Sequence, residues 1–387
     1  MQPVTCIEDL RRLYRKRVPR MFVDYCESGS WTETTLRRNL EDFARIQLHQ
    51  RVALGVDECS QRTTMLGEDV ALPVALAPVG MLGMQRADGE LLAARAAANF
   101  GVPFTLSTMS IASIEDVAAY SGRPFWFQLY VMRDHAFIGQ LIDRAKAAGC
   151  SALVLTLDLQ VMGQRHRDVK NGLSTSPRPT PRNLADLARH PRWCLGMART
   201  RRRGFGNIVG RVKGVRDMTS LAAWTAGQFD RGLDWDDVDW IRERWGGKLV
   251  LKGILDPADA RRAVDYGADA IVVSNHGGRQ LDGAPSSISV LPGIVAGVGN
   301  DCEVWLDSGV RSGQDVLKAL ALGARAVMIG RAFVYGLGAM GEAGVTTVLE
   351  LIRRELDLTM VLCGVRSIPE IDRSVLHRNG VRDNFHS

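Results

Sequence analysis

The segment SNHGGRQLD, residues 274–282, concentrates side chains that suit acid–base chemistry and anion binding. His276 can accept a proton near neutral pH. Arg279 can hold a carboxylate through two parallel hydrogen bonds and so fix its orientation. The two glycines between them permit a tight turn and the close approach of a ligand. The pattern predicts a site that removes a proton from an anionic substrate, whereas the alternative is a turn in which Arg279 only pairs with Asp282.

Polar side chains also stand at the end of the other apolar runs of the chain. One polar residue after a strand indicates only a loop, but a ring of them at one end of a barrel indicates a site. The residues in these positions are Ser107, Gln128, Tyr130, Thr156, Asp158, Lys252, Ser274, Asp307, Arg311 and Arg331.

The last two apolar runs are followed by glycines and arginines, in LDSGVRSG (306–313) and IGR (329–331). Glycines admit the oxygens of a phosphate, main-chain amides donate to them, and Arg311 and Arg331 supply positive charge. Barrels often bind phosphate with the loops after the seventh and eighth strands. We therefore favour a phosphate site over ordinary glycine turns with surface arginines.

The earlier runs end in neutral hydrogen-bonding residues, namely Ser107, Gln128 and Thr156. A phosphate alone does not need these groups, but a flat heteroaromatic ring does. Lys252, after an apolar strand, would place a cation beside such a ring and stabilise electron density that arrives on it. A lysine whose stem is buried and whose head reaches water is the alternative. With no dinucleotide motif, the residues predict FMN or another phosphorylated cofactor.

Eight short apolar runs separated by helical patterns must position these residues. Near-continuous apolar runs are typical of parallel strands buried on both faces, and the alternation predicts an α/β fold, a (β/α)₈ TIM barrel. A doubly wound sheet is the alternative, but APVGMLGM after the first run is not the GxGxxG loop that such a sheet usually carries. The runs are 72–78, 103–107, 125–130, 152–157, 248–253, 270–275, 303–309 and 326–331.

We expect one domain over residues 1–387. Residues 1–70 form an N-terminal helical cap that opens with a basic helix and continues irregularly. Residues 71–335 form the barrel, with a long loop insertion at 160–247 after the fourth strand. Residues 336–387 form a C-terminal helix and tail.

The composition is that of an ordinary soluble globular protein. The seven cysteines have no CxxC spacing, which argues against a metal site and favours reduced thiols in the cytoplasm. No apolar run approaches the roughly 20 residues of a membrane-spanning helix, and the N-terminus has no secretory apolar region.

Most of the positive charge lies in one basic segment, residues 165–215, which holds thirteen Lys and Arg against two Asp. Trp193, Leu195 and Met197 lie among these arginines, a mixture that can bind an anionic membrane surface. The alternative is a solvated basic lid. Nucleic acid is not an expected partner because the basic run lacks a binding fold.

Taken together, the motifs resemble those of the FMN-dependent L-2-hydroxy acid dehydrogenase/oxidase family, which includes L-lactate dehydrogenases, glycolate oxidases and mandelate dehydrogenases. The resemblance runs from DYCESG through LAPVG, LST, FQLYV, LTLD, LKGI and SNHGGRQLD to DSGVRSG and IGRAF. LAPVG and GILDPADAR are most similar to bacterial, quinone-linked L-lactate dehydrogenases. The resemblance implies FMN as the cofactor and a homotetramer.

The resemblance also implies a role for each matching residue. His276 is implied to be the catalytic base and Asp158 its partner. Arg165 and Arg279 are implied to bind the substrate carboxylate. The remaining substrate contacts are implied to come from Tyr25, Tyr130 and Met109. Lys252 is implied to lie at the N1–C2=O edge of the flavin. The other implied cofactor residues are Pro78, Val79 and Gly80 at the reactive edge, Ser107, Gln128, Thr156 and Ser274 at the ring and ribityl chain, and Asp307, Gly309, Arg311, Gly330 and Arg331 at the ribityl chain and phosphate.

Two residues depart from the family pattern. Val79 replaces a threonine found in some members, and Met109 replaces a tryptophan common in glycolate oxidases. Because methionine is flexible, it makes the pocket more adaptable in substrate size.

The implied reaction is the oxidation of an L-2-hydroxy acid, with L-lactate favoured, to the 2-oxo acid. Loss of the hydroxyl proton with hydride transfer and loss of the Cα proton need the same residues. The electrons are expected to pass to quinone at the inner face of the cell membrane. The alternatives are an oxidase that releases hydrogen peroxide, a mandelate-type enzyme for aromatic 2-hydroxy acids, and a barrel isomerase or aldolase without redox chemistry.

Overall fold

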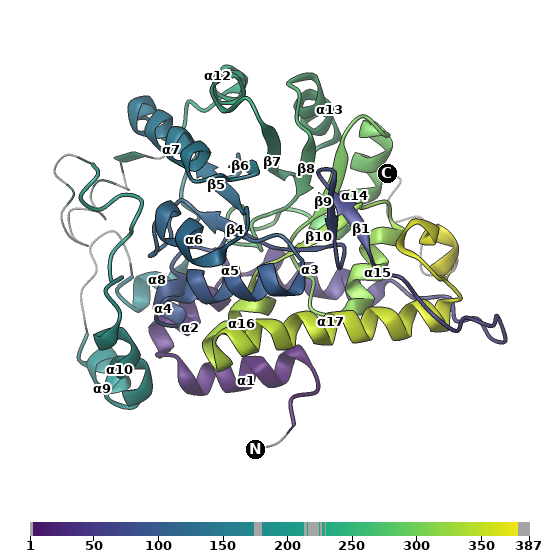
Figure 1. The fold of residues 1–387 in the computed structure, drawn as a ribbon, viewed down its shortest axis with the longest axis horizontal. Coiled ribbons are helices and arrows are strands. Elements are labelled where there is room, and N and C mark those ends of the chain that lie inside the picture. Colours follow the sequence, from purple (N-terminus) through teal and green to yellow (C-terminus); the bar gives the residue numbers. More distant parts are fainter. Residues whose placement is uncertain are drawn as a thin grey trace.

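The computed structural model describes residues 3–173, 180–212, 215, 224, 227–228 and 230–377. Parts of the predicted basic segment, at 174–179 and 213–214, and the predicted tail after His377 lie outside the described residues. Figure 1 shows a barrel of strands surrounded by helices. The predicted (β/α)₈ fold with an N-terminal helical cap is therefore confirmed.

The barrel strands coincide with the eight predicted apolar runs. They pair in parallel in the order β3-β10-β9-β8-β7-β6-β5-β4, and a parallel bridge from Leu76 to Phe104 joins the first and last strands. All carboxyl ends consequently meet at one mouth. The strands are β3 (Val74–Leu76), β4 (Thr105–Ser107), β5 (Trp126–Tyr130), β6 (Ala152–Thr156), β7 (Lys248–Ile254), β8 (Ala270–Val273), β9 (Glu303–Leu306) and β10 (Ala326–Ile329).

Helices follow each strand and return the chain to the other end of the barrel. Ser113 and Asp234 begin two of them with reciprocal capping boxes, which satisfy the first free amides. These helices are α4 (Leu82–Gln85), α5 (Gly89–Phe100), α6 (Ile114–Ser121), α7 (His135–Ala147), α12 (Trp235–Trp245), α13 (Pro257–Asp265), α14 (Ser287–Val298), α15 (Gly313–Ala321) and α16 (Arg331–Met340).

A hairpin closes the amino end of the barrel. Strands β1 (Thr63–Met65) and β2 (Glu68–Val70) place Met65 and Val70 in one buried cluster with Trp126 and Trp305. The two indole rings stack inside the barrel with centroids 5.1 Å apart. Because these described residues fill the amino end of the barrel, the barrel interior is accessible from the carboxyl ends of the strands. This hairpin was not predicted, because residues 1–70 were expected to continue irregularly after the first helix.

The N-terminal cap consists of α1 (Ile7–Arg17), α2 (Arg20–Glu27) and α3 (Thr34–Arg45). The basic helix at the start was expected, but α3 was not. Its buried side chains are Thr35, Asn39 and Phe43, so the buried face is largely polar. Leu36, Leu40 and Phe43 nevertheless have the spacing of an amphipathic helix, a signal that could have predicted it. The long C-terminal helix α17 (Glu342–Cys363) packs against α16 (Figure 1).

The insertion after β6 is largely helical in its described part. It contains α8 (His166–Lys170), α9 (Pro181–Ala188) and α10 (Pro191–Arg199) before α12. The Trp193 ring stacks on Phe22 of α2 at 5.3 Å, and its indole N–H donates to the Met84 carbonyl (2.9 Å). Figure 1 shows α9 and α10 at the outer edge of the molecule. Among the described helices, none has the length and apolar character needed to span a bilayer.

Candidate active site

A cavity of about 530 Å³ lies at the carboxyl ends of the barrel strands. Lys252, His276, Arg279 and Arg331, which are far apart in sequence, surround this one space. The sequence-predicted residues that line it are Tyr25, Pro78, Val79, Gly80, Met109, Tyr130, Arg165, Lys252, His276, Arg279, Asp307, Gly309, Arg311, Gly330 and Arg331.

The other predicted residues do not line the cavity but lie next to residues that do. Thr156 is in register between Tyr130 and Lys252, which both line it. Within the described part of the chain, Thr156 Oγ1 and Gln128 Nε2 are buried without a hydrogen-bond partner. The predicted residues that lie outside the cavity lining are Asp158, Ser107, Gln128, Thr156 and Ser274.

His276 is paired with Asp158 at the cavity wall, with Nδ1 2.8 Å from Oδ1. Its φ of 57° lies in the left-handed region, and its main-chain amide donates to Ser274 Oγ at 3.1 Å. Burial lowers the pKa of His276; Asp158 opposes this effect, while Lys252 and Arg279 add to it. The ring is therefore neutral at neutral pH. With Nδ1–H donating to the carboxylate, Nε2 is able to accept a proton.

A glycine makes room for Asp158. Gly253 has a φ of 107° and lies where the register of β7 against β8 shifts. A Cβ atom at this position would lie 2.7 Å from both Cβ and Cγ of Asp158. Since real Cβ atoms are not found so close, only glycine lets this carboxylate reach His276.

Lys252 is held in a buried polar cluster. Its Nζ donates to Ser274 Oγ (2.9 Å) and lies 3.1 Å from Asp307 Oδ2, to which Ser274 also donates. Burial opposes both charges, but the pairing is stronger, so the pKa of Lys252 is raised and that of Asp307 is lowered. The cluster keeps a cation at the cavity wall.

The last turn of α2 holds two arginines of the cavity. Arg279 donates to the carbonyls of Tyr25 and Ser28, and Arg331 donates to those of Cys26 (2.8 Å) and Ser28 (3.0 Å). A helix C-terminus attracts cations because its carbonyls carry partial negative charge. One helix end thus positions two guanidinium groups.

The alternative for Arg279 was a turn in which it pairs with Asp282, but Asp282 binds other groups. Asp282 accepts main-chain hydrogen bonds from Thr32 and Thr35, both at 2.9 Å, and so ties the loop after β8 to the cap.

Arg165 and Arg279 lie near each other in the cavity. Their guanidinium carbons lie 5.9 and 4.8 Å from the Tyr25 ring centroid. Burial and the charge of Arg279 lower the pKa of Arg165, whose Nε lies 3.5 Å from Asp168 Oδ2. A buried and a half-buried cation that share one nearby carboxylate suit an additional anion. Asp168 was not predicted as a site residue, although its i+3 spacing from Arg165 was a usable signal.

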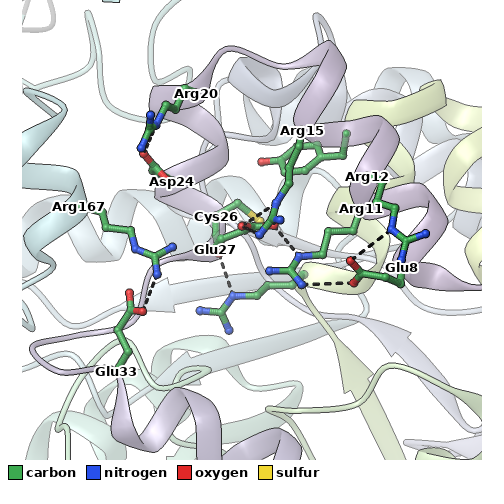
Figure 2. A network of polar contacts seen from close by, with 12 residues as sticks. Glu8, Arg11, Arg12, Arg15, Arg20, Asp24, Cys26, Glu27, Glu33 and Arg167 are labelled. Carbon is green, nitrogen blue, oxygen red and sulfur yellow. Dashed lines mark hydrogen bonds and ion pairs between the residues drawn. The ribbon is translucent and has the colours of Figure 1, made fainter.

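Ion pairs fix the end of α2 against α1. The buried carboxylate of Glu27 accepts from Arg11 Nε (2.7 Å) and Arg15 Nε (3.0 Å), as Figure 2 shows. The same view shows Arg167 of α8 reaching Glu33 (2.6 Å), which links the insertion to the cap. The carbonyls that hold the two arginines consequently belong to an anchored segment.

The part of the cavity at the start of α16 suits a phosphate. Gly330 precedes α16, which begins at Arg331, so free amides of a helix N-terminus lie at the cavity. A Cβ atom at Gly330 would meet no protein atom nearer than 3.8 Å, and the space above it therefore belongs to the cavity. Burial lowers the pKa of Arg331 to about 10, which leaves it charged at neutral pH.

Comparisons with known proteins identify the family of the chain. The family model for FMN-dependent dehydrogenase matches residues 14–378. An L-lactate dehydrogenase of Caulobacter vibrioides is 48% identical over 378 residues, covering 96% of this chain and 97% of that protein. One from Pseudomonas aeruginosa is 46% identical over 376 residues, covering 97% and 98%. The crystal structure of the monotopic membrane protein (S)-mandelate dehydrogenase has a TM-score of 0.92 at 37% identity, covering 97% and 100%.

The fold and the cavity define a barrel oxidoreductase that uses a phosphorylated cofactor. The chain belongs to the FMN-dependent dehydrogenase family. Within that family it is an FMN-dependent L-2-hydroxy acid dehydrogenase.

The residues at the mouth fit FMN. The unpaired Gln128 amide and Thr156 hydroxyl are buried donors that suit the carbonyls and nitrogens of a flavin ring. Lys252 supplies a nearby cation, and the open space over Gly330 at the start of α16 suits the phosphate.

Proposed function

We propose that this enzyme oxidises L-lactate to pyruvate, with His276 as the base. The observation that carries the proposal is the His276–Asp158 pair in a cavity that also holds Arg165 and Arg279. The sequence similarity to L-lactate dehydrogenases, at 46–48% identity, supports lactate as the substrate. We also propose that residues 1–387 act as a single FMN hydroxy-acid dehydrogenase domain.

The proposed cofactor contacts follow the layout of the cavity. FMN, when bound, accepts two electrons from the substrate. Lys252 would stabilise the negative charge that this transfer adds to the ring, and the backbone of Pro78, Val79 and Gly80 would face the reactive edge. Residues assigned to the ring and ribityl chain are Ser107, Gln128, Thr156, Ser274, Asp307 and Gly309, and those assigned to the phosphate are Arg311, Gly330 and Arg331.

The proposed substrate contacts orient a hydroxy acid. Arg279 and Arg165 hold the carboxylate, and Tyr25 and Tyr130 donate hydrogen bonds to substrate oxygens. Such positioning removes much of the entropic barrier. His276 Nε2 takes a proton, and Asp158 stabilises the imidazolium that forms.

Anaerobic reduction of the bound flavin tests the function. We expect L-lactate to bleach the yellow enzyme faster than D-lactate or L-mandelate at equal concentration, because the cavity positions a carboxylate and one Cα–H. Stopped-flow absorbance measures the rates. A flavin that no L-2-hydroxy acid reduces would contradict the proposal.

An aromatic 2-hydroxy acid is the second candidate, favoured by the apolar side of the cavity. Met109, Met162 and Phe205 all line it, and methionines adapt to larger groups. Similar solved structures include (S)-mandelate dehydrogenase and a mandelate oxidase. Faster reduction of the flavin by L-mandelate would establish this reading.

We propose quinone as the electron acceptor and oxygen as the alternative. The two acceptors differ in product, because oxygen yields hydrogen peroxide. We expect re-oxidation by a soluble quinone to exceed re-oxidation by air-saturated buffer by at least about tenfold, a 1.4 kcal/mol difference in barrier. Peroxide formed in equal amount to pyruvate, with no faster quinone reaction, would establish an oxidase.

We further propose a homotetramer that is cytoplasmic and binds the inner face of the cell membrane through α9 and α10. Leu184 and Leu195 are 58% and 50% exposed and lie among arginines. A similar solved structure is described as a monotopic membrane protein. Apolar side chains with basic neighbours suit an anionic bilayer surface.

Vesicle binding tests the membrane contact. Leu184→Glu with Leu195→Glu should weaken partition onto anionic vesicles by about tenfold or more, since both apolar contacts are lost. Leu40→Glu on α3, where the side chain is 44% exposed, is the matched control. Flotation measures the bound fraction, and equal binding by both variants would rule out this contact.

Light scattering of the protein without vesicles tests the tetramer.

A further inference from the structure

The loop that carries Asp158 depends on a side chain of another loop. Gln280 Nε2 donates to the carbonyls of Asp158 (2.7 Å) and Val161 (2.8 Å), and Gln280 Oε1 accepts from the Gly163 amide (3.2 Å). Among the described residues, no main-chain to main-chain hydrogen bond holds residues 158–163. One amide group therefore supplies the hydrogen bonds to the main chain of this loop.

The place of Gln280 in the chain connects the two halves of the proposed acid–base pair. It follows Arg279 directly and lies four residues after His276, while the carbonyl it binds belongs to Asp158 itself. The two loops are in contact here, because a Cβ atom at Gly163 would lie 2.3 Å from the Arg279 carbonyl oxygen. Gln280 is 9% exposed, so water does not readily replace its hydrogen bonds.

We propose that Gln280 is a positioning residue that holds the main chain of Asp158 and thereby sets the His276–Asp158 pair. The inference rests on the proposed role of His276 as the base. A carboxamide offers two donors and an acceptor, which is the set that two carbonyls and one amide require. An ionised glutamate has no donors, and leucine of similar size has neither kind of group.

Loosening this loop changes what surrounds the imidazole. The charged groups that face His276 are Asp158 from the loop after β6, Lys252 from β7 and Arg279 from its own loop. When Asp158 withdraws, the two remaining charges are both positive, and the imidazolium becomes harder to form. The base then has a lower pKa and stabilises the proton that it accepts less well.

The test compares FMN-loaded Gln280→Leu and Gln280→Glu with the wild type. Gln61→Leu is the matched control, because Gln61 is also buried and its amide donates to the Arg353 carbonyl (2.9 Å) in α17. We expect both Gln280 variants to keep FMN and lose about 10- to 100-fold in kcat/KM, part of the usual contribution of a base. The acid limb of kcat/KM should move to lower pH in Gln280→Leu, which adds no charge, and Gln61→Leu should keep the wild-type limb.

Two readouts separate positioning from general damage. NMR titration of labelled histidine in the resting holoenzyme should give a lower pKa for His276 in Gln280→Leu, whether or not lactate is the substrate. In an Asp158→Asn background the same substitution should add little further loss, because Gln280 acts through Asp158. An unchanged His276 pKa in both Gln280 variants, or fully additive losses, would overturn the proposal. Gln280→Glu matches the native side chain in size and serves if the leucine variant does not fold.

Discussion

His276→Gln should retain its FMN and lose turnover by about 10²–10⁴-fold, the usual contribution of a positioned base. The substituted amide can occupy the same space but cannot take up a proton at neutral pH. Because His276 is not among the groups at the phosphate side of the cavity, the visible flavin absorbance should be unchanged. The measurement is the anaerobic rate of flavin reduction by L-lactate.

The pH dependence of the wild type belongs to the same prediction. The base works in its deprotonated form, and burial lowers the pKa of His276. The acid limb of kcat/KM should therefore have its midpoint below about 6.5, the ordinary value for histidine. His135→Gln, at an exposed ring stacked on Trp240, is the control and should leave both rate and profile unchanged. A His276→Gln enzyme that turns over normally would remove this residue from the chemistry.

Arg279→Ala should lower kcat/KM by about 10³-fold, with losses in both substrate binding and turnover. The guanidinium is half-buried, is held by carbonyls at the end of α2, and shares the cavity with Arg165. Arg279→Lys restores the charge but not the two parallel hydrogen bonds, so it should recover only part of the loss.

Steady-state kinetics and pyruvate binding to the oxidised enzyme measure these effects. Arg38→Ala removes one exposed arginine from α3 and controls for the change in net charge. If Arg279→Ala binds pyruvate as tightly as the wild type, Arg279 does not hold the carboxylate.

The barrel was predictable because each strand is a continuous apolar run, and the carboxyl ends of parallel strands necessarily meet. From that rule, Lys252, His276 and Arg331 were predicted to lie at one mouth of the barrel. It did not specify depth, and Gln128 and Thr156 therefore appear in the predicted site but lie outside the cavity wall.

What the sequence did not predict depends on contacts between segments. Helix α3 was missed although Leu36, Leu40 and Phe43 have helical spacing, and its packing also buries the polar Thr35 and Asn39. Gln280 lies within a motif that was singled out, yet its partners are main-chain groups some 120 residues away, which leave no trace in residue type. The carbonyls of α2 that hold Arg279 and Arg331 are invisible for the same reason.

The hydrogen bond from Arg331 to a carbonyl of α2 determines when this part of the cavity can form during protein synthesis. The arginine and its carbonyl partner in Cys26 are separated by 305 positions, so a ribosome must complete nearly the whole polypeptide before this contact can form. If Arg331 binds the flavin phosphate as proposed, a growing chain lacks a complete phosphate site, and cofactor binding becomes one of the last events of maturation.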